Sequence, residues 1–346
     1  MSRSTVEKLG FVLAALAPIV LVIWLVSRSE TMEAGSNFWA LAFSPDGRAV
    51  VSVSGVNAPE DVTHAGEVIF WDLTTGLARI AIRTNVPFRS VAFATNGQFL
   101  AVGDFGGNIR KIGADQGKEI DTLRVPGQPV NAVAVSPDNS TILAGALNGS
   151  VLLWDTANKT NDAISIPGGR VVNLALSPSG RILVVGGQSG MAYVLDLSAR
   201  IQPLQIQASL EPATVEAVAF SADGAQFITG CQLDLKLWEA QFGKLVREFH
   251  GLKSRVNSIA LSPDGHAVAA VDSDGTLTMW NRANGLMLRS IQAHDGIAFD
   301  VVYSPDGKRL ATVGREDFQI KIWDAASGQL ISTLDRSKVH QTTKRP

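Results

Sequence analysis

Few side chains in this sequence could do acid–base or metal chemistry, and the most suggestive are histidines close to acidic residues. The chain has five histidines and 32 acidic residues. A histidine beside a carboxylate can act as a general base or contribute to a metal site. His294 and His250 have acidic residues nearby, and both recur at related points of a repeat described below. His64 also lies near two acidic residues, but no second histidine stands beside it, which disfavours a metal site there.

Other reactive motifs do not support catalysis. The single cysteine, Cys231, excludes an intramolecular disulfide, and its place in the apolar run 226–231 favours a buried structural thiol. The sequence contains no Cys-x-x-Cys pair, no Gly-x-Ser-x-Gly elbow and no phosphate-binding loop. We therefore predict no catalytic residue, no metal and no cofactor.

The strongest pattern is a repeat with a period of roughly 40–45 residues. A turn signature of the Ser-Pro-Asp-Gly type begins at Ser44, Ala94, Ser136, Ser177, Ser221, Ser262 and Ser304. A second landmark, the end of the third strand of each repeat, falls at Trp71, Ile112, Trp154, Leu195, Trp238, Trp280 and Trp323. Successive turns are 50, 42, 41, 44, 41 and 42 residues apart, so both landmarks keep one period. Short apolar strands separated by these turns predict four-stranded antiparallel sheets.

The repeats resemble those of the WD-repeat β-propeller family. Trp is followed by Asp at positions 71, 154 and 323, and degenerate forms occupy the other four repeats. The resemblance spans about residues 37–335 and implies an all-β, seven-bladed propeller of four-stranded antiparallel blades. It is specific for fold and says little about function, because one fold hosts many functions.

The resemblance also implies a hydrogen-bonded network within each well-formed blade. The last repeat matches it with His294, Thr312, Asp317 and Trp323. The sixth repeat has His250, Asp274 and Trp280, but an alanine replaces the hydroxyl residue. Trp71, Trp154 and Trp238 are expected to be structural in the same way. These positions make a structural role for the histidines more favourable than a catalytic one, and apolar packing must hold most blades together.

Positions that break the repeat lie near the start of the inner strands, the end that the family resemblance implies is used to bind partners, and we predict a docking surface there. The predicted partner-binding residues are Trp39, Arg89, Asn131, Glu216, Asn257, Phe299 and Asp300. Aromatic residues and arginine are typical interface anchors. The longest interval reflects an insertion at 55–65, which is expected to rim the same face. The alternative is that Trp39 and Phe299 simply pack the seam between the first and last blades.

Two functions remain open. The favoured one is a non-catalytic protein–protein interaction scaffold, with an accessory subunit of a membrane complex as one form. The alternative is an extracytoplasmic propeller hydrolase or lactonase-like enzyme, which would use convergent side chains such as Glu216, Asp300 and His64. The net charge of −2 gives no basic footprint for nucleic acid, so the expected partner is a protein of unknown identity.

The N-terminal region predicts a membrane anchor. Residues Leu9 to Val26 form an 18-residue run without a charged residue, close to the length that spans a bilayer. A cleaved secretory signal is the alternative. Two basic residues precede the run and one follows closely, which favours a cytoplasmic N-terminus and an extracytoplasmic propeller, periplasmic in a bacterium.

These interpretations divide the chain into five parts. Residues 1–8 form a flank, 9–26 a transmembrane signal anchor, 27–36 a linker, 37–335 the propeller and 336–346 a basic disordered tail. Each blade is complete in sequence, so ring closure is expected to depend on packing between the first and last blades.

Overall fold

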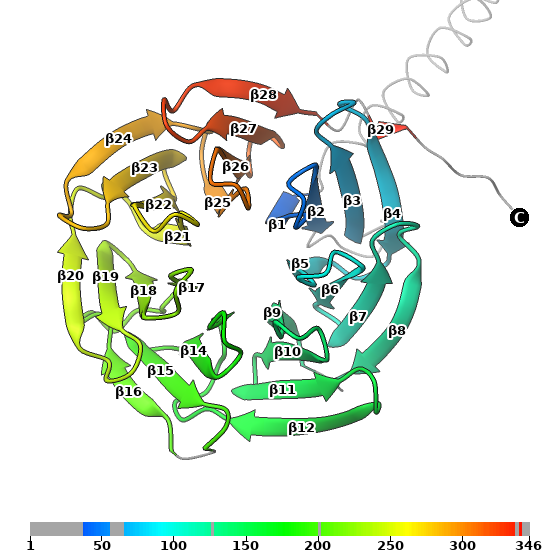
Figure 1. Cartoon of the computed structure of the whole chain (residues 1–346), viewed down its shortest axis with the longest axis horizontal. Helices are drawn as coiled ribbons and strands as arrows, with labels where there is room; N and C mark the ends of the chain where they lie inside the picture. The colour runs from blue at the N-terminus through cyan, green and yellow to red at the C-terminus, as the bar shows by residue number, and fades with distance from the viewer. Residues whose placement is uncertain (1–36, 56–65, 126–127, 200–201, 336–338, 341–346) are drawn as a thin grey trace, which may run out of the picture. The chain divides into compact units, whose positions relative to one another are not determined.

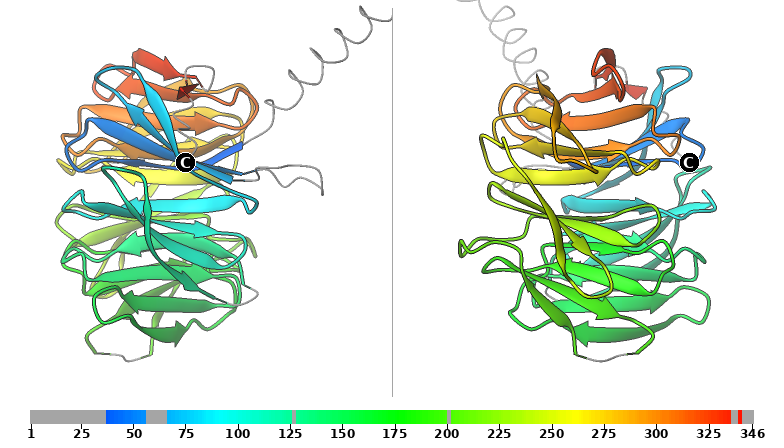
Figure 2. Two further views of the ribbon diagram at one scale, coloured as in Figure 1. Left: turned by 90° about the vertical axis from the view of Figure 1, so that its right-hand side faces the viewer. Right: turned by 60° about the vertical axis from the view of Figure 1, so that its left-hand side comes forward.

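The computed structural model describes residues 37–55, 66–125, 128–199, 202–335 and 339–340. These residues form seven antiparallel sheets arranged around a central axis (Figure 1). The first strand of each blade lies nearest the central axis and the outer strands form the rim, and Figure 2 shows the ring from the side. The predicted all-β, seven-bladed propeller with four antiparallel strands per blade is therefore confirmed.

The blades follow one another in sequence. Blade one contains β1 (Asn37–Phe43), β2 (Ala49–Gly55), β3 (Gly66–Asp72) and β4 (Ala78–Thr84). Blade two contains β5 (Phe88–Phe93), β6 (Phe99–Asp104), β7 (Asn108–Gly113) and β8 (Glu119–Arg124). Blade three contains β9 (Val130–Val135), β10 (Thr141–Ala146), β11 (Ser150–Asp155) and β12 (Thr160–Ser165). Blade four contains β13 (Asn173–Leu176), β14 (Ile182–Gly186), β15 (Met191–Asp196) and β16 (Leu204–Gln207).

The second half of the ring repeats this order. Blade five contains β17 (Ala217–Phe220), β18 (Gln226–Cys231), β19 (Asp234–Glu239) and β20 (Leu245–Phe249). Blade six contains β21 (Val256–Leu261), β22 (Ala267–Asp272), β23 (Thr276–Asn281) and β24 (Met287–Gln292). Blade seven contains β25 (Ala298–Tyr303), β26 (Arg309–Gly314), β27 (Ile320–Asp324) and β28 (Leu330–Leu334).

The turn signature makes the hairpin between the first two strands of a blade. In blade seven the Ser304 hydroxyl donates to the Asp306 carboxylate at 2.6 Å and receives the Arg309 amide at 2.9 Å. Gly307 then adopts a φ of 71°, a region that suits glycine. In blade three the same position is Asn139, with a φ of 63°, and asparagine is the residue that best tolerates this conformation after glycine. The turn signature therefore determines the geometry of this hairpin through contacts within the turn itself.

The hydrophobic core consists of seven clusters, each between two neighbouring blades. The cluster between blades seven and one packs Phe38 and Trp71 against Val313 and Ile322. Cys231 is buried in the cluster between blades four and five, and burial raises the pKa of its thiol to about 11. That thiol is protonated at neutral pH, as expected for a structural cysteine.

Ring closure uses side chains as well as apolar packing. Arg309 of blade seven donates to the Gly47 carbonyl of blade one at 2.6 Å. An additional short strand, β29 (Val339–His340), pairs in parallel with Ala78 and Arg79 at the outer edge of blade one. Two residues of the predicted disordered tail are thus ordered by backbone pairing, which the tail's polar composition did not indicate. The rest of that tail lies outside the described residues.

The predicted anchor, residues 9–26, the flank and the linker also lie outside the described residues. Among the residues that are described, no helix has the length and apolar character needed to cross a bilayer. Gly55 of the predicted insertion at 55–65 ends β2, and the rest of the insertion, including His64, lies outside the described residues.

Candidate functional site

Six of the seven predicted docking residues lie near the start of five inner strands, and the seventh lies just before a sixth inner strand. Trp39 lies in β1, Arg89 in β5, Asn131 in β9, Asn257 in β21, and Phe299 and Asp300 in β25, while Glu216 immediately precedes β17. Figure 1 shows these strands around the opening, with β5 and β17 on opposite sides of it. Each of the seven residues is partly buried. We call the surface formed by these seven residues, at the start of the inner strands, the channel mouth.

An aromatic and guanidinium stack crosses the seam between blades seven and one. The rings of Phe299 and Trp39 lie 4.7 Å apart, and the Arg89 guanidinium lies 4.3 Å from the Trp39 ring and 5.2 Å from the Phe105 ring. The Trp39 indole donates to the Gly55 carbonyl at 3.2 Å. Trp39 and Phe299 therefore do pack the seam, and each keeps part of its surface exposed.

The two asparagines connect neighbouring blades. The Asn131 side-chain amide donates to the Val171 carbonyl of the next blade at 3.0 Å, and Asn257 donates to the Ala298 carbonyl at 2.9 Å. Asn173 makes the same kind of bond to the Glu216 carbonyl at 3.0 Å. In each case the amide satisfies a backbone acceptor in the first strand of the next blade or in the segment just before that strand, which is a structural function.

Asp300 links three blades. Its carboxylate accepts the Leu41 amide of blade one at 2.7 Å, the Ser258 hydroxyl of blade six at 2.6 Å and its neighbouring Val301 amide at 2.9 Å. Burial raises the pKa of Asp300 to about 6, and the three hydrogen bonds oppose this shift. The carboxylate is therefore engaged in ring closure and does not point freely to solvent.

Charged side chains from four blades interact at the channel mouth. Glu216 pairs with Arg255 at 3.5 Å. Burial raises the pKa of Glu216, and the positive charges of Arg255, Arg89 and Arg170 oppose that shift. Burial lowers the pKa of Arg89, an effect that Glu216 opposes and Arg170 reinforces. The group holds three positive charges and one negative charge.

Sequence reasoning missed Arg170, Arg255 and Phe105. A signal for the two arginines was present, since each stands seven residues before the turn signature of its blade. For Phe105 no repeat position gave a clue, because it lies in a hairpin turn whose contact with Arg89 depends on the folded blade.

The predicted blade-seven network is present in the structure. The Trp323 indole donates to the Thr312 hydroxyl at 2.8 Å. The His294 ring joins the same hydroxyl and the Asp317 carboxylate, each at 2.8 Å. Although burial acts to raise it, the pKa of Asp317 lies below its usual value, because His294 hydrogen-bonds to it and Lys321 adds positive charge.

Two other tryptophans donate their indole N–H to a hydroxyl group at the equivalent position of their own blades. Trp71 donates to Ser52 at 2.8 Å and Trp238 to Thr229 at 2.9 Å. Both hydroxyl residues stand eight positions after the start of the turn signature, as Thr312 does in blade seven. Trp154 is buried and packs in the cluster between blades two and three.

Blade six departs from the expected network. The Trp280 indole donates to the backbone carbonyl of His250 at 2.9 Å, while the His250 side chain is exposed. Asp272 is buried and accepts the Asp274 and Thr276 amides. The cause is Ala270, which gives neither the indole nor the imidazole a hydroxyl partner.

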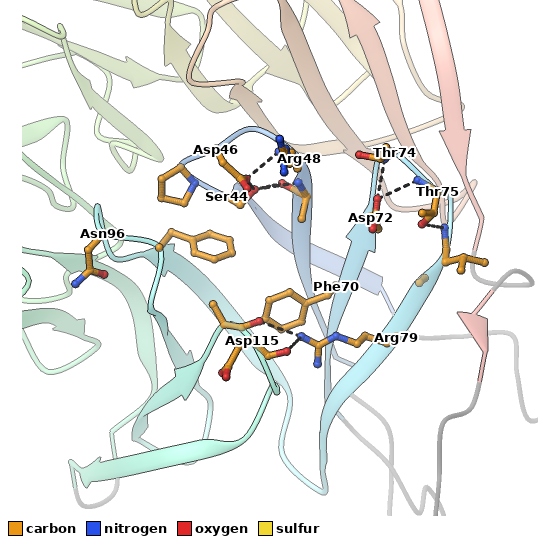
Figure 3. A pocket seen from close by; sticks show the side chains of 17 residues that line it. Ser44, Asp46, Arg48, Phe70, Asp72, Thr74, Thr75, Arg79, Asn96 and Asp115 are labelled. Atoms are coloured by element: carbon orange, nitrogen blue, oxygen red, sulfur yellow. Dashed lines mark hydrogen bonds between the residues drawn. The ribbon is translucent and has the colours of Figure 1, made fainter.

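A groove of about 1040 Å³ opens at the opposite end of the inner strands, between blades one and two (Figure 3). Arg79 crosses it, donating to the carbonyls of Ala114 and Asp115 at 3.0 and 2.9 Å and lying 4.4 Å from the Phe70 ring. The sequence gave no indication of this groove, because its walls come from turns of two different blades. Within the described parts of the chain, no group of three or more His, Cys, Asp or Glu side chains is arranged to hold a metal ion.

The chain is similar in sequence to several curated proteins. The chain is 28% identical over 275 residues to the cilia- and flagella-associated protein 52 of Chlamydomonas reinhardtii, a match that covers 78% of this chain and 44% of that protein. It is 26% identical to the guanine nucleotide-binding protein subunit beta of Arabidopsis thaliana, covering 35% of this chain and 34% of that protein. An uncharacterized WD repeat-containing protein of Synechocystis is 29% identical, covering 28% of each chain. In all three the match spans less than half of the relative's length.

A solved chain from the crystal structure of the mitotic checkpoint complex superposes with a TM-score of 0.73 at 20% identity, covering 83% of this chain and 86% of that chain. At this identity the likeness concerns the fold alone. A family model described as the N-terminal β-propeller domain of nucleolar protein 10-like proteins matches residues 74–306, which is more than half of the chain. Together with the seven blades and their Trp-Asp strand ends, this match shows that the chain belongs to that β-propeller family, within the WD-repeat proteins.

Proposed function

We propose that this protein is a membrane-anchored, non-catalytic interaction module whose channel mouth docks a protein partner, and that it serves as an accessory subunit of a membrane complex. The carrying observation is the partly exposed stack of Phe299, Trp39 and Arg89 on a ring that is braced at the same place by Asp300. Aromatic and arginine side chains on a rigid support are the typical anchors of protein interfaces.

The acidic side chains considered for catalysis support this choice. Asp300 accepts three hydrogen bonds and Glu216 is paired with Arg255. A general base or metal ligand needs a lone pair that is available to the substrate or the metal. Both carboxylates are instead occupied within the protein.

The membrane part of the proposal comes from the sequence. Residues Leu9 to Val26 are apolar and uncharged, and their flanking basic residues favour a cytoplasmic N-terminus with the propeller on the extracytoplasmic side. A retained anchor would hold the propeller close to the bilayer, because the linker at 27–36 is short.

Native purification tests the docking function. Full-length protein is extracted in mild detergent, its mass is determined and co-purifying chains are identified. A stable larger assembly that is lost in a Trp39→Ala and Phe299→Ala double variant supports a docked partner. A lone chain of monomer mass under all extraction conditions contradicts constitutive assembly.

Anchoring and orientation need a separate measurement. Cys231 is buried, so we expect it not to react with a bulky maleimide, and a Lys244→Cys variant then carries a single exposed thiol. Labelling of intact cells by a membrane-impermeant maleimide, with the protein in the alkali-washed membrane fraction, is expected. A soluble protein, or labelling only after lysis, would contradict the anchor or the orientation respectively.

A further inference from the structure

We propose that the channel mouth binds an acidic segment of a partner protein, rich in Asp and Glu, with Arg89 and Arg170 facing its carboxylates. This proposal rests on the docking function above and adds the chemistry of the partner. Three arginines and one glutamate interact at this end of the inner strands, and Arg255 is already paired with Glu216. The Asp300 carboxylate is also there, but it is taken up by three hydrogen bonds to Leu41, Ser258 and Val301. Among the described residues, Arg89 and Arg170 are therefore the arginines of this group without an ion-pair partner.

Arg89 is held ready for an anion. Its guanidinium makes cation–π contacts with the rings of Trp39 and Phe105, and these contacts restrain its position. Within the described residues it makes no hydrogen bond or ion pair, so its five N–H donors are not used by the protein there. A partly buried guanidinium without an acceptor favours a ligand that supplies carboxylate oxygens in a bidentate geometry.

Arg170 supplies a second, more accessible charge. It is exposed, lies in the connection between β12 and β13, and acts electrostatically on both Arg89 and Glu216. Because Arg89 belongs to blade two and Arg170 precedes the first strand of blade four, the two charges come from different blades. An extended acidic segment can meet both, while a basic segment would be repelled.

The neighbouring aromatic rings give the site an apolar side. Trp39 and Phe299 are partly exposed beside Arg89, so an acidic segment that also carries an apolar residue would bury ring surface on binding. The two rings are uncharged, so the preference between an acidic and a neutral ligand depends on the arginines.

The test uses fluorescence anisotropy with the full-length protein in detergent. The probe is a short fluorescein-labelled peptide rich in Asp and Glu with one Leu, and its neutral twin replaces the acids with Asn and Gln. We expect the acidic peptide to bind more tightly, and its affinity to fall as NaCl rises from about 50 mM to about 300 mM, because exposed charge pairs are screened. Equal binding of the two peptides would overturn the proposal.

Substitutions of single charged residues test which side chains bind the acidic peptide. Arg89→Gln and Arg170→Gln are each expected to weaken binding of the acidic peptide by about fivefold, the size of one partly exposed charge contact. Glu216→Gln removes the negative charge among the arginines and is expected to tighten binding by about twofold to fivefold. Tightening cannot result from misfolding. Arg48→Gln, an exposed arginine in the turn at the other end of β1, is the matched control and should bind like the original chain.

The outcomes separate this proposal from the docking function. If Trp39 and Phe299 are needed for native assembly but Arg89→Gln and Arg170→Gln bind the acidic peptide as the unmodified chain does, docking stands and the acidic partner is wrong. If the peptide binds and responds to all three charge variants while no assembly is purified, the site stands and constitutive assembly is wrong.

Discussion

Single hydroxyl groups decide how the tryptophan indole is satisfied in blades one, five and seven. Thr312 receives the Trp323 indole and contacts the His294 ring in the same fully buried position. Ala270 occupies the corresponding position in blade six, and Trp280 turns to a backbone carbonyl instead. A buried donor that loses its acceptor costs more than a net hydrogen bond is worth, so these positions are unequal in their sensitivity to substitution.

Thr312→Val is expected to destabilise the protein by about 1–3 kcal/mol, because the Trp323 indole and one His294 nitrogen lose their partner while the shape is kept. Urea denaturation followed by tryptophan fluorescence gives the midpoint. His250→Ala is the control: the His250 side chain is exposed, so its midpoint should stay nearly unchanged. Equal losses in the two variants would show that the blade-seven network contributes nothing special.

Asp300 is expected to make stability depend on pH. Burial raises its pKa from 3.8 to about 6 in the folded protein, so the folded state holds the proton more tightly than the unfolded chain. Its contribution is fully present below about 3.8 and is lost as pH rises through about 6. The loss is on the order of 3 kcal/mol.

The measurement compares the unfolding free energy of the original chain with that of Asp300→Asn from pH 4 to pH 7.5. The original chain should lose stability relative to the variant as pH rises. A difference that stays constant over this range would mean that Asp300 does not titrate as its burial requires.

One short strand outside the repeat, β29, also contributes to closure of the ring. β29 pairs with only two residues of β4, yet it follows the last strand of blade seven and lies on blade one. Such a strand joins the two ends of the ring through backbone hydrogen bonds, each with a net contribution of about 1 kcal/mol.

Deleting residues 336–346 is therefore expected to lower the melting temperature by a few degrees, since about 1 kcal/mol shifts the midpoint by about 2–4 °C in a domain of this size class. Deleting only residues 341–346 keeps β29 and should leave the melting temperature unchanged. If the two deletions act alike, the pairing of β29 with β4 has no part in stability.

The ring as a unit is built from blades that are each complete in sequence. All four strands of a blade are consecutive, and each hydrophobic cluster joins two neighbouring blades. Repeat architectures of this kind gain stability from the interfaces between units. The place where the chain begins should then matter less than whether a blade stays intact.

A circular permutant of residues 37–335 that opens between Leu252 and Lys253 separates blades five and six without cutting a sheet. Its melting temperature should stay within several degrees of the uncut form. A permutant opened between Ser273 and Asp274 divides the hairpin of β22 and β23 and should be much less stable. The reverse order would show that blades are not the units of stability.

The sequence alone determined the features that depend on contacts within one repeat. The turn geometry at Gly307 and the hydroxyl acceptor at Thr312 could be read from the sequence, because each depends on neighbours within one blade. The tertiary structure decided what depends on ring closure: Asn131 and Asn257 bond to the next blade, Asp300 joins three blades, and Arg89 meets Glu216 across the opening. These contacts follow from the curvature and number of the blades, and no residue spacing records them. For the same reason Phe105 could not be foreseen beside Arg89, nor β29 beside β4, since both depend on backbone and side-chain positions that only the closed ring sets.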